Sequence, residues 1–324
     1  FENRVYDVLL RDGSRVVAKF YRPGRWSQAQ ILEEHAFMRE LDEDEVPICG
    51  LRPFPDGSTL KSIDGIWYCL YDRVSGRAPE DLNEESVERL GMMAARIHNA
   101  GARSDAPERL RLDADTYVRD NLPTLSLEGR LPGHLRDRYL RVANDVADLA
   151  ERLLCGVETF RIHGDFHPGN VLLRDGRFFV LDFDDMVVGP AVQDLWMLIP
   201  GRDAHSIRLR EVFLEAYGHF RAIDRATLDL IEPLRGLRRV HYAAWLARRW
   251  HDPLFPATWP QYGTDDWWAE ELADLGDVLV HAAAGGMPTG MDAELQAAAA
   301  DVPTNADLFW DWEEPTDGGD GRDR

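Results

Sequence analysis

Hydrophobic and polar positions along the first quarter of the chain predict β-strands. Apolar and β-branched residues dominate Val5–Leu10 and again Arg15–Tyr21, and the pair Asp12-Gly13 between these runs is typical of a tight turn. Two such runs joined by a turn pair predict a β-hairpin. Further strands are expected over Leu51–Phe54 and Gly65–Tyr71.

A helix is expected between these strands, over Ser27–Leu41. Apolar side chains recur there at helical spacing, and Ser27 is a suitable N-cap. The acidic run Asp42–Glu45 follows and is expected to be a solvated helix end or a loop. It is an unusual helix C-terminus, because negative charge at that end opposes the helix dipole.

Beyond Gly76 the apolar positions take helical spacing, most clearly over Glu84–Ala100 and Leu135–Leu154. Short strand-like runs return within Phe160–Val188, and the pattern is helical again from Ala191 onward. We therefore predict an α+β fold of two lobes. The first is small and β-rich with one helix, and the second is larger and mainly helical.

The boundary between the lobes is expected at Asp72–Gly76, which gives an N-terminal lobe over residues 1–74 and a C-terminal lobe over residues 75–314. Residues 315–324 are rich in Gly and Asp and are expected to form a disordered tail. Because the chain starts at Phe1 and not at a methionine, we expect the N-terminal lobe to lack its natural beginning. Small molecules bind preferentially between domains, so the cleft between the lobes is the expected site.

Composition narrows the classes of function. The chain has 324 residues with 37 Lys and Arg against 58 Asp and Glu, so its net charge is −21 and no nucleic-acid partner is expected. Such charge would attract a cationic small molecule but is equally consistent with solubility. No run of 18 apolar residues is present, so no membrane span is expected. The three cysteines form no C-x-x-C pair, which argues against disulfides or structural zinc and favours the reducing cytoplasm.

The candidate chemistry lies around a second predicted hairpin. Its strands are Val171–Leu173 and Phe178–Leu181, joined by a turn at Asp175-Gly176. A hairpin brings the residues before its first strand close to those after its second, so three carboxylates and one amide should gather at its open end. These residues are Asp165, Asn170, Asp182 and Asp184. Their oxygen atoms suit Mg²⁺, and a bound cation would relieve the repulsion among the carboxylates.

Spacing along the chain adds a more specific signal. Asp165 precedes Asn170 by five residues, the interval between the base and the metal-binding Asn in the H-R-D-x-x-x-x-N loop of protein kinases. Asp182 follows a strand, as the Asp of the kinase D-F-G motif does. Each feature alone is weak, but their common order along one chain favours a kinase.

Lys19 adds a further kinase-like feature, nearer the N-terminus. It ends the segment Val16–Lys19, which resembles the V-A-I-K strand whose lysine pairs with ATP phosphates. Glu33 and Glu34 on the next predicted helix are suitable ion-pair partners for it. Without the downstream motif, Lys19 would as readily be a solvated strand residue.

Together these motifs resemble the aminoglycoside phosphotransferase and choline kinase superfamily, and more narrowly its bacterial stress response kinases. The wider resemblance rests on His163-Gly164-Asp165 with Asn170, on Asp182 and on Gly189–Leu195. The narrower one rests on Phe1–Tyr6, Lys19–Pro23, Ile31–His35 and Ala244–Trp250. The sequence departs from protein kinases in having no G-x-G-x-x-G loop before Lys19, where these relatives have a segment like Phe1–Arg4.

The resemblance implies a two-lobed protein-kinase-like fold with a nucleotide-binding N-terminal lobe. It implies transfer of phosphate from ATP, with Mg²⁺, to Ser or Thr of a protein, the chain itself included, in the bacterial cytoplasm. It also implies roles for single residues. Asp165 would be the catalytic base, and Asn170 and Asp182 the metal ligands. Lys19 would bind the phosphates with Glu34 as its partner, and the backbone of Asp72 to Val74 would be the hinge that binds adenine.

Other functions stay open. Within the same superfamily the acceptor could be a small molecule, such as an aminoglycoside, a choline-like compound or another hydroxyl metabolite. The pattern His163-x-Asp165-x-His167 could instead hold a transition metal for hydrolysis, which would leave Asn170 and Lys19 without a role. An inactive kinase that binds ATP as a scaffold is a third class, and the presence of all four motif residues argues against it.

Three residues near the motif have simpler interpretations. We expect His163 to hydrogen-bond the backbone around Asp165, and Asp194 to act as a helix cap or loop anchor. Asp184 could equally bind metal or only end the hairpin.

Overall fold

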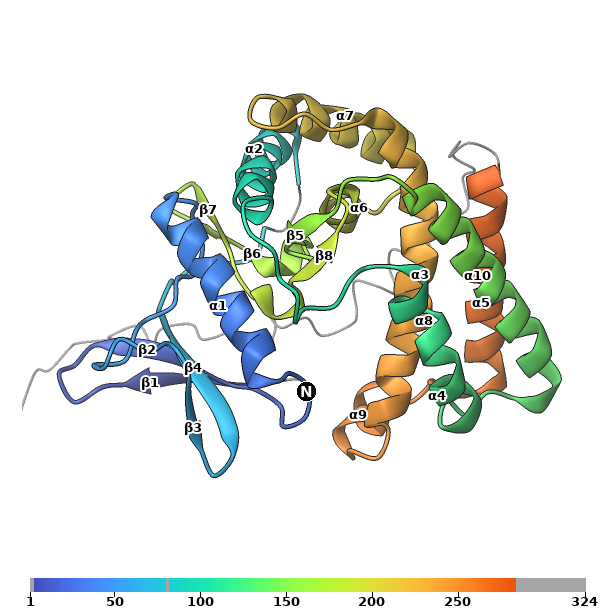
Figure 1. Cartoon of the computed structure of the whole chain (residues 1–324), viewed down its shortest axis with the longest axis horizontal. Helices are drawn as coiled ribbons and strands as arrows, with labels where there is room; N and C mark the ends of the chain where they lie inside the picture. The colour runs from blue at the N-terminus through green and yellow to red at the C-terminus, as the bar shows by residue number, and fades with distance from the viewer. Residues whose placement is uncertain (1–2, 80–81, 284–324) are drawn as a thin grey trace, which may run out of the picture.

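The computed structural model describes residues 3–79 and 82–283, which form a strand-rich lobe and a helical lobe (Figure 1). The small lobe is a four-stranded antiparallel sheet in the order β1-β2-β4-β3. Its strands are β1 (Arg4–Leu9), β2 (Arg15–Phe20), β3 (Lys61–Ile63) and β4 (Ile66–Asp72). The β1–β2 hairpin is the one predicted around Asp12-Gly13, and Gly13 supplies the positive φ of 86° that its turn needs.

Helix α1 (Gln28–Glu43) packs on the small lobe beside this sheet (Figure 1). Ser27 caps it as expected, in a capping box with Gln30, because the Ser27 hydroxyl accepts from the Gln30 amide while the Gln30 side chain accepts from the Ser27 amide. The face turned inward includes Phe37 and Met38, which are almost fully buried.

The strand expected over Leu51–Phe54 is wrong. Only a single bridge between Leu51 and Tyr71 forms there, and Pro53, which has no amide hydrogen, interrupts any ladder that would continue from it. The sequence analysis also missed β3, which is three residues long. The turn Asp64-Gly65, with both φ angles positive, pairs β3 with β4.

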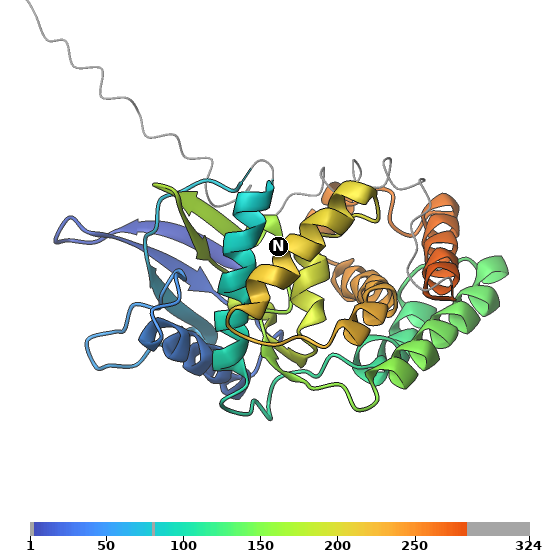
Figure 2. The same ribbon diagram turned by 90° about the horizontal axis from the view of Figure 1, so that it is seen from above.

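Eleven helical segments build the described part of the helical lobe. They are α2 (Glu84–Gly101), α3 (Ala114–Tyr117), η1 (Arg119–Asn121), α4 (Leu122–Leu127), α5 (Gly133–Leu154), α6 (Val192–Leu198), α7 (Ala204–Gly218), η4 (Arg225–Leu230), α8 (Ile231–Arg249), α9 (Leu254–Thr258) and α10 (Asp265–Ala283), with η4 leading directly into α8. Helices α2 and α7 lie side by side, and α5, α8 and α10 pack together at the end far from the strands (Figure 2). Among the described helices, none combines the length and the apolar content that crossing a bilayer requires.

Two short antiparallel strand pairs lie between the lobes. One joins β5 (Phe160–Ile162) to β8 (Val187–Gly189), and the other joins β6 (Val171–Arg174) to β7 (Arg177–Val180). The chain after α1 pairs with β7, since the Cys49 amide donates to the Val180 carbonyl at 2.9 Å and the Val180 amide donates to the Pro47 carbonyl at 3.0 Å. The small lobe is therefore joined to the second hairpin by backbone hydrogen bonds as well as by the chain itself.

The arrangement agrees with the expected small β-rich lobe and larger helical lobe. The boundary near residue 74 stays a prediction, and the tail expected over residues 315–324 lies outside the described residues, as do Phe1 and Glu2.

Gly101 allows helix α2 to contact β5 closely. A Cβ atom at this position would lie 1.9 Å from the carbonyl oxygen of Arg161, a backbone atom that cannot move without shifting β5. The same contact is held by the Arg161 guanidinium, which donates to the Gly101 carbonyl at 3.2 Å.

We predict that Gly101→Ala lowers the free energy of unfolding by about 2–4 kcal/mol, because the added methyl group overlaps that backbone oxygen. Gly276→Ala is the matched control. It lies inside α10 with no heavy atom within 4 Å of its Cβ position, so it should raise stability by up to about 1 kcal/mol through helix propensity. Thermal and urea unfolding of both variants measure this, and equal effects of the two changes would contradict the packing described.

Candidate active site

The β6–β7 hairpin forms as predicted and brings its two ends together. Its turn residues Asp175 and Gly176 both have positive φ, of 48° and 72°. At the open end, the Leu181 amide donates to the Asn170 carbonyl at 3.1 Å. Asn170 therefore lies directly across from the residue that precedes Asp182, as the sequence pattern required.

A buried carboxylate fixes the loop that carries Asp165. Asp194, on α6, accepts hydrogen bonds from the backbone amides of His163 at 3.0 Å and Gly164 at 2.8 Å. Its second buried partner is the His98 ring, at 2.9 Å. Asp194 is thus the loop anchor that was expected from the sequence. It accepts hydrogen bonds from two backbone amides that have no partner in a strand pair.

Gly164 could not be replaced in this loop without strain. Its φ is +82°, and a Cβ atom would lie 2.4 Å from the Asp185 carbonyl oxygen. The close approach lets the loop before Asp165 pass directly over the segment that follows Asp182.

His163 links the two halves of the motif through backbone atoms. Its Nε2 lies 3.0 Å from the Leu181 carbonyl, and its Nδ1 accepts from the Asp165 amide at 3.3 Å. Both ring nitrogens of this fully buried side chain are therefore engaged, and Nε2 must carry the proton. His163 is therefore not available as a metal ligand, and within the described ranges no group of three or more His, Cys, Asp or Glu side chains is placed to hold a metal ion.

Asp165 is surrounded by positive and hydrogen-bonding groups. Arg238 on α8 donates to its Oδ1 at 2.5 Å, and His167 Nε2 lies 3.4 Å from its Oδ2. Burial alone would raise the pKa of this carboxyl, but the Arg238 guanidinium and the His167 ring hold it far below its usual value. Asp165 is therefore an ionised hydrogen-bond acceptor at neutral pH.

The side chain of Asn170 has the features of a ligand for a divalent ion. Its Nδ2 donates to the Asp165 carbonyl at 2.9 Å, which fixes the orientation of the amide. Its buried Oδ1 is left with no hydrogen-bond partner among the described residues. An orphaned amide oxygen beside Asp182 fits a hard cation that takes its remaining ligands from phosphate and water.

Lys19 forms the centre of an ion cluster between the lobes. Its Nζ lies 2.8 Å from Asp182 Oδ1 and 3.0 Å from Asp184 Oδ1. Burial would lower the pKa of this ammonium, but the two carboxylates raise it well above its usual value, so it stays charged. The motif lysine and the motif aspartate, 163 residues apart in sequence, are thus in direct contact.

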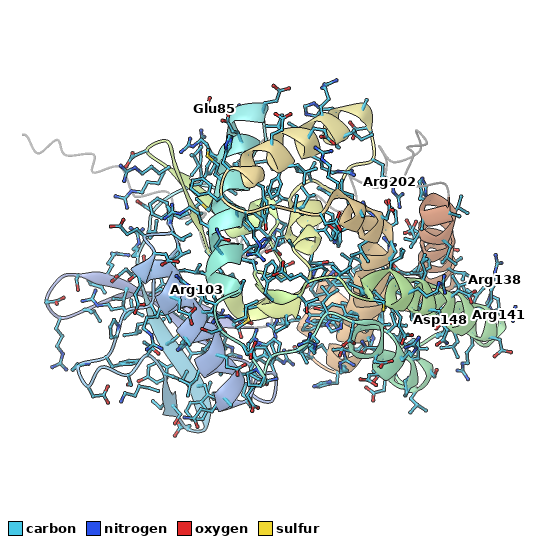
Figure 3. The ribbon with its side chains drawn as sticks, turned by 45° about the horizontal axis from the view of Figure 1, so that its top comes forward. Glu85, Arg103, Arg138, Arg141, Asp148 and Arg202 are labelled. Atoms are coloured by element: carbon cyan, nitrogen blue, oxygen red, sulfur yellow. The ribbon has the colours of Figure 1, made fainter. Side chains whose placement is uncertain are left out.

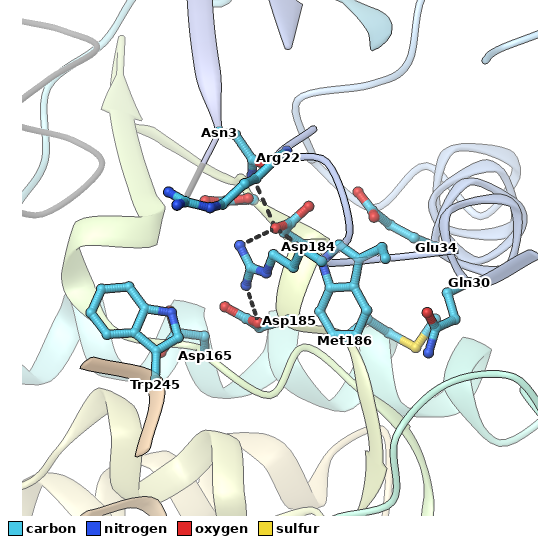
Figure 4. Close-up of polar contacts among 12 residues, drawn as sticks. Asn3, Arg22, Gln30, Glu34, Asp165, Asp184, Asp185, Met186 and Trp245 are labelled. Carbon is cyan, nitrogen blue, oxygen red and sulfur yellow. Dashed lines mark hydrogen bonds and ion pairs between the residues drawn. The ribbon is translucent and has the colours of Figure 1, made fainter. Parts of the chain in front are cut away.

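Asp184 connects the lobes instead of facing an open site. Beyond Lys19, its Oδ2 lies 2.7 Å from an Arg25 guanidinium nitrogen and accepts from Asn3 at 3.0 Å (Figure 4). The same guanidinium reaches Asp185 at 2.5 Å. With both oxygens paired to cations and its side chain buried, Asp184 corresponds to the structural one of its two expected roles.

Glu34 does not form the expected ion pair with Lys19 in this structure. The Lys19 ammonium contacts Asp182 and Asp184, while Glu34 Oε1 accepts from the Tyr21 hydroxyl at 3.2 Å. Its Oε2 lies 4.0 Å from Arg109 and has no hydrogen-bond partner in the described part of the chain. The physical reason is competition, since two aspartates already neutralise the single ammonium. Burial then dominates and raises the pKa of Glu34 to about 7.

The expected hinge lies beside a small apolar cluster. Asp72 is the last residue of β4, and its side chain points to solvent, 3.6 Å from Arg52. Val74 packs against buried Leu172 and Leu181 from the ends of the second hairpin, separately from the main core. An apolar surface between the lobes suits a flat heteroaromatic base, and the roles of Asp72 and Val74 stay predictions.

Three arginines at the site were missed by the sequence analysis: Arg25, Arg109 and Arg238. Arg109, almost fully buried, donates to the Met186 carbonyl at 2.8 Å and also to the Asp184 carbonyl, and it stacks 4.2 Å from the centre of the Trp26 ring. None of the three lies in a motif with a recognisable spacing. Only the unusual number of arginines on α8 could have indicated that some of them face a carboxylate.

A known family and known proteins match most of the chain. The model of the "Phosphotransferase enzyme family" matches residues 1–231. Stress response kinase A of Escherichia coli K12 is 39% identical over 274 residues, covering 84% of this chain and 83% of that protein. Serine/threonine protein kinase RdoA of Salmonella typhimurium is 39% identical over 272 residues, covering 84% of this chain and 82% of that protein.

Solved structures share the fold at low sequence identity. Amicoumacin kinase hAmiN, in complex with AMP-PNP, Ca²⁺ and Ami, has a TM-score of 0.68 and 19% identity over 86% of this chain and 85% of that one. A microcompartment-associated aminopropanol kinase has a TM-score of 0.64 and 16% identity over 93% and 94%. Together with the family match, these likenesses confirm the two-lobed kinase-like fold.

We predict that Glu34 makes stability fall as pH rises. Because its pKa is about 7 in the folded protein and near 4.5 when exposed, the folded state retains a proton that the unfolded state releases between those values. Glu34→Gln removes the free-energy cost of ionising this buried carboxyl. The stability of the variant relative to wild type should therefore increase by about 3 kcal/mol from pH 5 to pH 8. Urea unfolding at several pH values measures it.

Glu43→Gln, at an exposed position on the same helix, is the control and should show no such trend. A constant difference between wild type and Glu34→Gln over this pH range would contradict a carboxyl whose pKa is raised by burial.

Proposed function

The chain belongs to the phosphotransferase enzyme family and is an ATP-dependent phosphotransferase, and we propose that its acceptor is a serine or threonine hydroxyl of a protein. The observation that carries the catalytic part of the proposal is the constellation at the open end of the second hairpin. There an ionised Asp165 lies against Asn170, which has a free side-chain oxygen. Asn170 lies across the hairpin from Leu181, and the next residue, Asp182, contacts Lys19.

In the proposed complex, ATP lies between the lobes. Its adenine would rest on the apolar surface of Val74, Leu172 and Leu181 and hydrogen-bond to backbone of the hinge. Lys19 would bind the phosphates. Asn170 and Asp182 would hold Mg²⁺, which would supply positive charge to offset the negative charge that develops on the phosphates. A reducing cytoplasm, where ATP is supplied, is the proposed location.

Asp165 would receive the acceptor hydroxyl. The acceptor oxygen forms a bond to the γ-phosphorus, the bond from that phosphorus to the β,γ-bridging oxygen breaks, and ADP leaves. The hydroxyl proton passes to Asp165 and then to water. Because Arg238 and His167 keep the Asp165 pKa low, its main contribution is to accept a hydrogen bond and orient the hydroxyl in line with the phosphorus.

The proposed protein acceptor is supported by the relatives. Two bacterial proteins of 39% identity, over more than four-fifths of both chains, carry the names stress response kinase A and serine/threonine protein kinase RdoA. The alternative is a small hydroxyl compound, which the names of the solved structures favour, but those likenesses lie below 20% identity. An assay must therefore offer both kinds of acceptor.

We predict that Asp182→Asn weakens Mg²⁺-dependent ATP binding by roughly ten- to hundredfold, because it removes a charge that contacts Lys19 and would hold the metal. Asn tolerates the left-handed conformation of Asp182, whose φ is 61°. The matched control is Asp175→Asn, also at positive φ but exposed in the hairpin turn. Calorimetry with Mg²⁺ and with EDTA measures the effect, and equal affinities for the two variants would remove Asp182 from the site.

We predict that γ-labelled ATP with Mg²⁺ labels serine or threonine of the protein itself or of a generic protein substrate. Asp165→Asn should retain ATP binding and lose transfer by about a hundredfold or more. Aminoglycosides, choline and ethanolamine, offered in parallel, should stay unlabelled. Label on one of these compounds and none on protein would replace the proposed acceptor by the small-molecule alternative.

A further inference from the structure

A cavity of about 460 Å³ lies between the small lobe and helix α8, beside the ion cluster. Its walls come from the loop between β2 and α1, from the segment around Asp185, and from α8 with the residues that follow it. It contains none of Lys19, Val74 or Leu172, so it is separate from the proposed nucleotide pocket. Its volume suits a small molecule or a few residues of a peptide.

The charge of the cavity is opposite to that of the protein. The chain as a whole has 58 acidic against 37 basic residues, yet four arginines line the cavity against one carboxylate, Asp185. These arginines are Arg22, Arg25, Arg248 and Arg249. Arg25 is paired with Asp184 and Asp185, and Arg22 lies 3.2 Å from Asp252.

Arg248 is held by an amide oxygen, whereas Arg22 and Arg25 are paired with carboxylates. Both terminal nitrogens of its guanidinium donate to one amide oxygen, Asn121 Oδ1, at 2.8 Å. Within the described ranges its side chain has no carboxylate within ion-pair distance, and the residue is exposed. The charge of Glu128 acts on this guanidinium from beyond ion-pair distance. A fixed, exposed guanidinium whose hydrogen-bond partner is neutral is suited to bind an anionic group from outside.

The pKa of the His241 ring indicates the sign of the electrostatic potential inside the cavity. Burial lowers its pKa to about 3, and Arg248, Arg238, Arg249 and Arg25 all act in the same direction. Four guanidinium groups thus oppose a further positive charge at the cavity wall, which indicates a positive potential there.

The cavity wall is connected to the catalytic cluster through neighbouring residues. Asp185, on its wall, follows the cluster that holds Asp182, and Arg238, which binds Asp165 at 2.5 Å, is one helical turn before His241 on α8. Figure 4 shows Trp245, another wall residue, on the same side of the cluster as Asp165 and Asp185. Asp165 is not itself a wall residue, so a molecule in the cavity would bring its hydroxyl to Asp165 by extending past Asp185 and Arg238.

We propose that this cavity is the acceptor site, and that Arg248 binds an anionic group which the acceptor carries close to its hydroxyl. The proposal rests on the proposed function and specifies it: the preferred acceptor is a Ser or Thr flanked by Asp, Glu or a phosphorylated residue. The same chemistry disfavours cationic acceptors such as aminoglycosides and choline, which Arg248 would repel.

The test uses three sets of synthetic peptides with a central Ser or Thr, flanked by Asp and Glu, by Ala and Gly, or by Lys and Arg. Wild-type protein should phosphorylate the acidic set with a kcat/KM roughly tenfold above the neutral set, since one charge-assisted hydrogen bond contributes about that factor. The basic set should be the poorest. Glycerol, glycerol 3-phosphate and choline are offered in parallel as small acceptors.

Substitutions at Arg248 test the role of this residue. Arg248→Gln should reduce the preference for acidic over neutral peptides to near unity, mainly through KM. Arg248→Glu should reverse it and improve the basic set, which loss of structure alone could not do. Arg138→Gln is the matched control, because it removes the same charge from the exposed face of α5 at the far edge of the molecule (Figure 3) and should leave the preference unchanged.

The outcomes separate this inference from the proposed function. Phosphorylation of peptides without preference for acidic flanks, or a preference that survives both Arg248 variants, overturns the inference and leaves a protein kinase. Label on glycerol 3-phosphate but on no peptide overturns the protein acceptor and keeps the anionic selectivity. Label on choline or glycerol alone overturns both.

Discussion

The site depends on the neutralisation of three aspartates that lie within four residues of each other. Asp182, Asp184 and Asp185 would repel one another in a buried position if no cations reached them. The small lobe supplies those cations as Lys19 and Arg25, which are held within 3.0 Å of the carboxylates. The ion cluster that prepares the site is therefore also a contact between the lobes, so catalysis and lobe packing share the same charges.

The opposite side of the site is held by hydrogen bonds to backbone groups. Asp194 holds the amides of His163 and Gly164, while His163 itself links Asp165 to the carbonyl before Asp182. Side chains used in this way fix the path of the main chain, and the motif residues then take their positions from it. A substitution at Asp194 would thus move Asp165 without touching any substrate.

Whether a feature could be predicted from the sequence depends on how far apart in the chain its interacting residues lie. The second hairpin was predictable because its Asp175-Gly176 turn is local, and the placement of Lys19 followed from motif order. The Arg238–Asp165 pair, 73 residues apart and outside any motif, could not be inferred, and neither could the preference of Lys19 for two aspartates over Glu34. The false strand at Leu51–Phe54 shows that apolar content alone does not outweigh a proline.

The pairing of the Pro47–Cys49 segment with β7 has a consequence for how the lobes can move. Besides the ion cluster, two backbone attachments hold the small lobe: the chain near residue 74 and the two hydrogen bonds to Val180. A simple bend at the first attachment would break the second. Any closure that keeps both must rotate about the line that joins them, so the geometry of these two attachments defines the pivot axis of the enzyme.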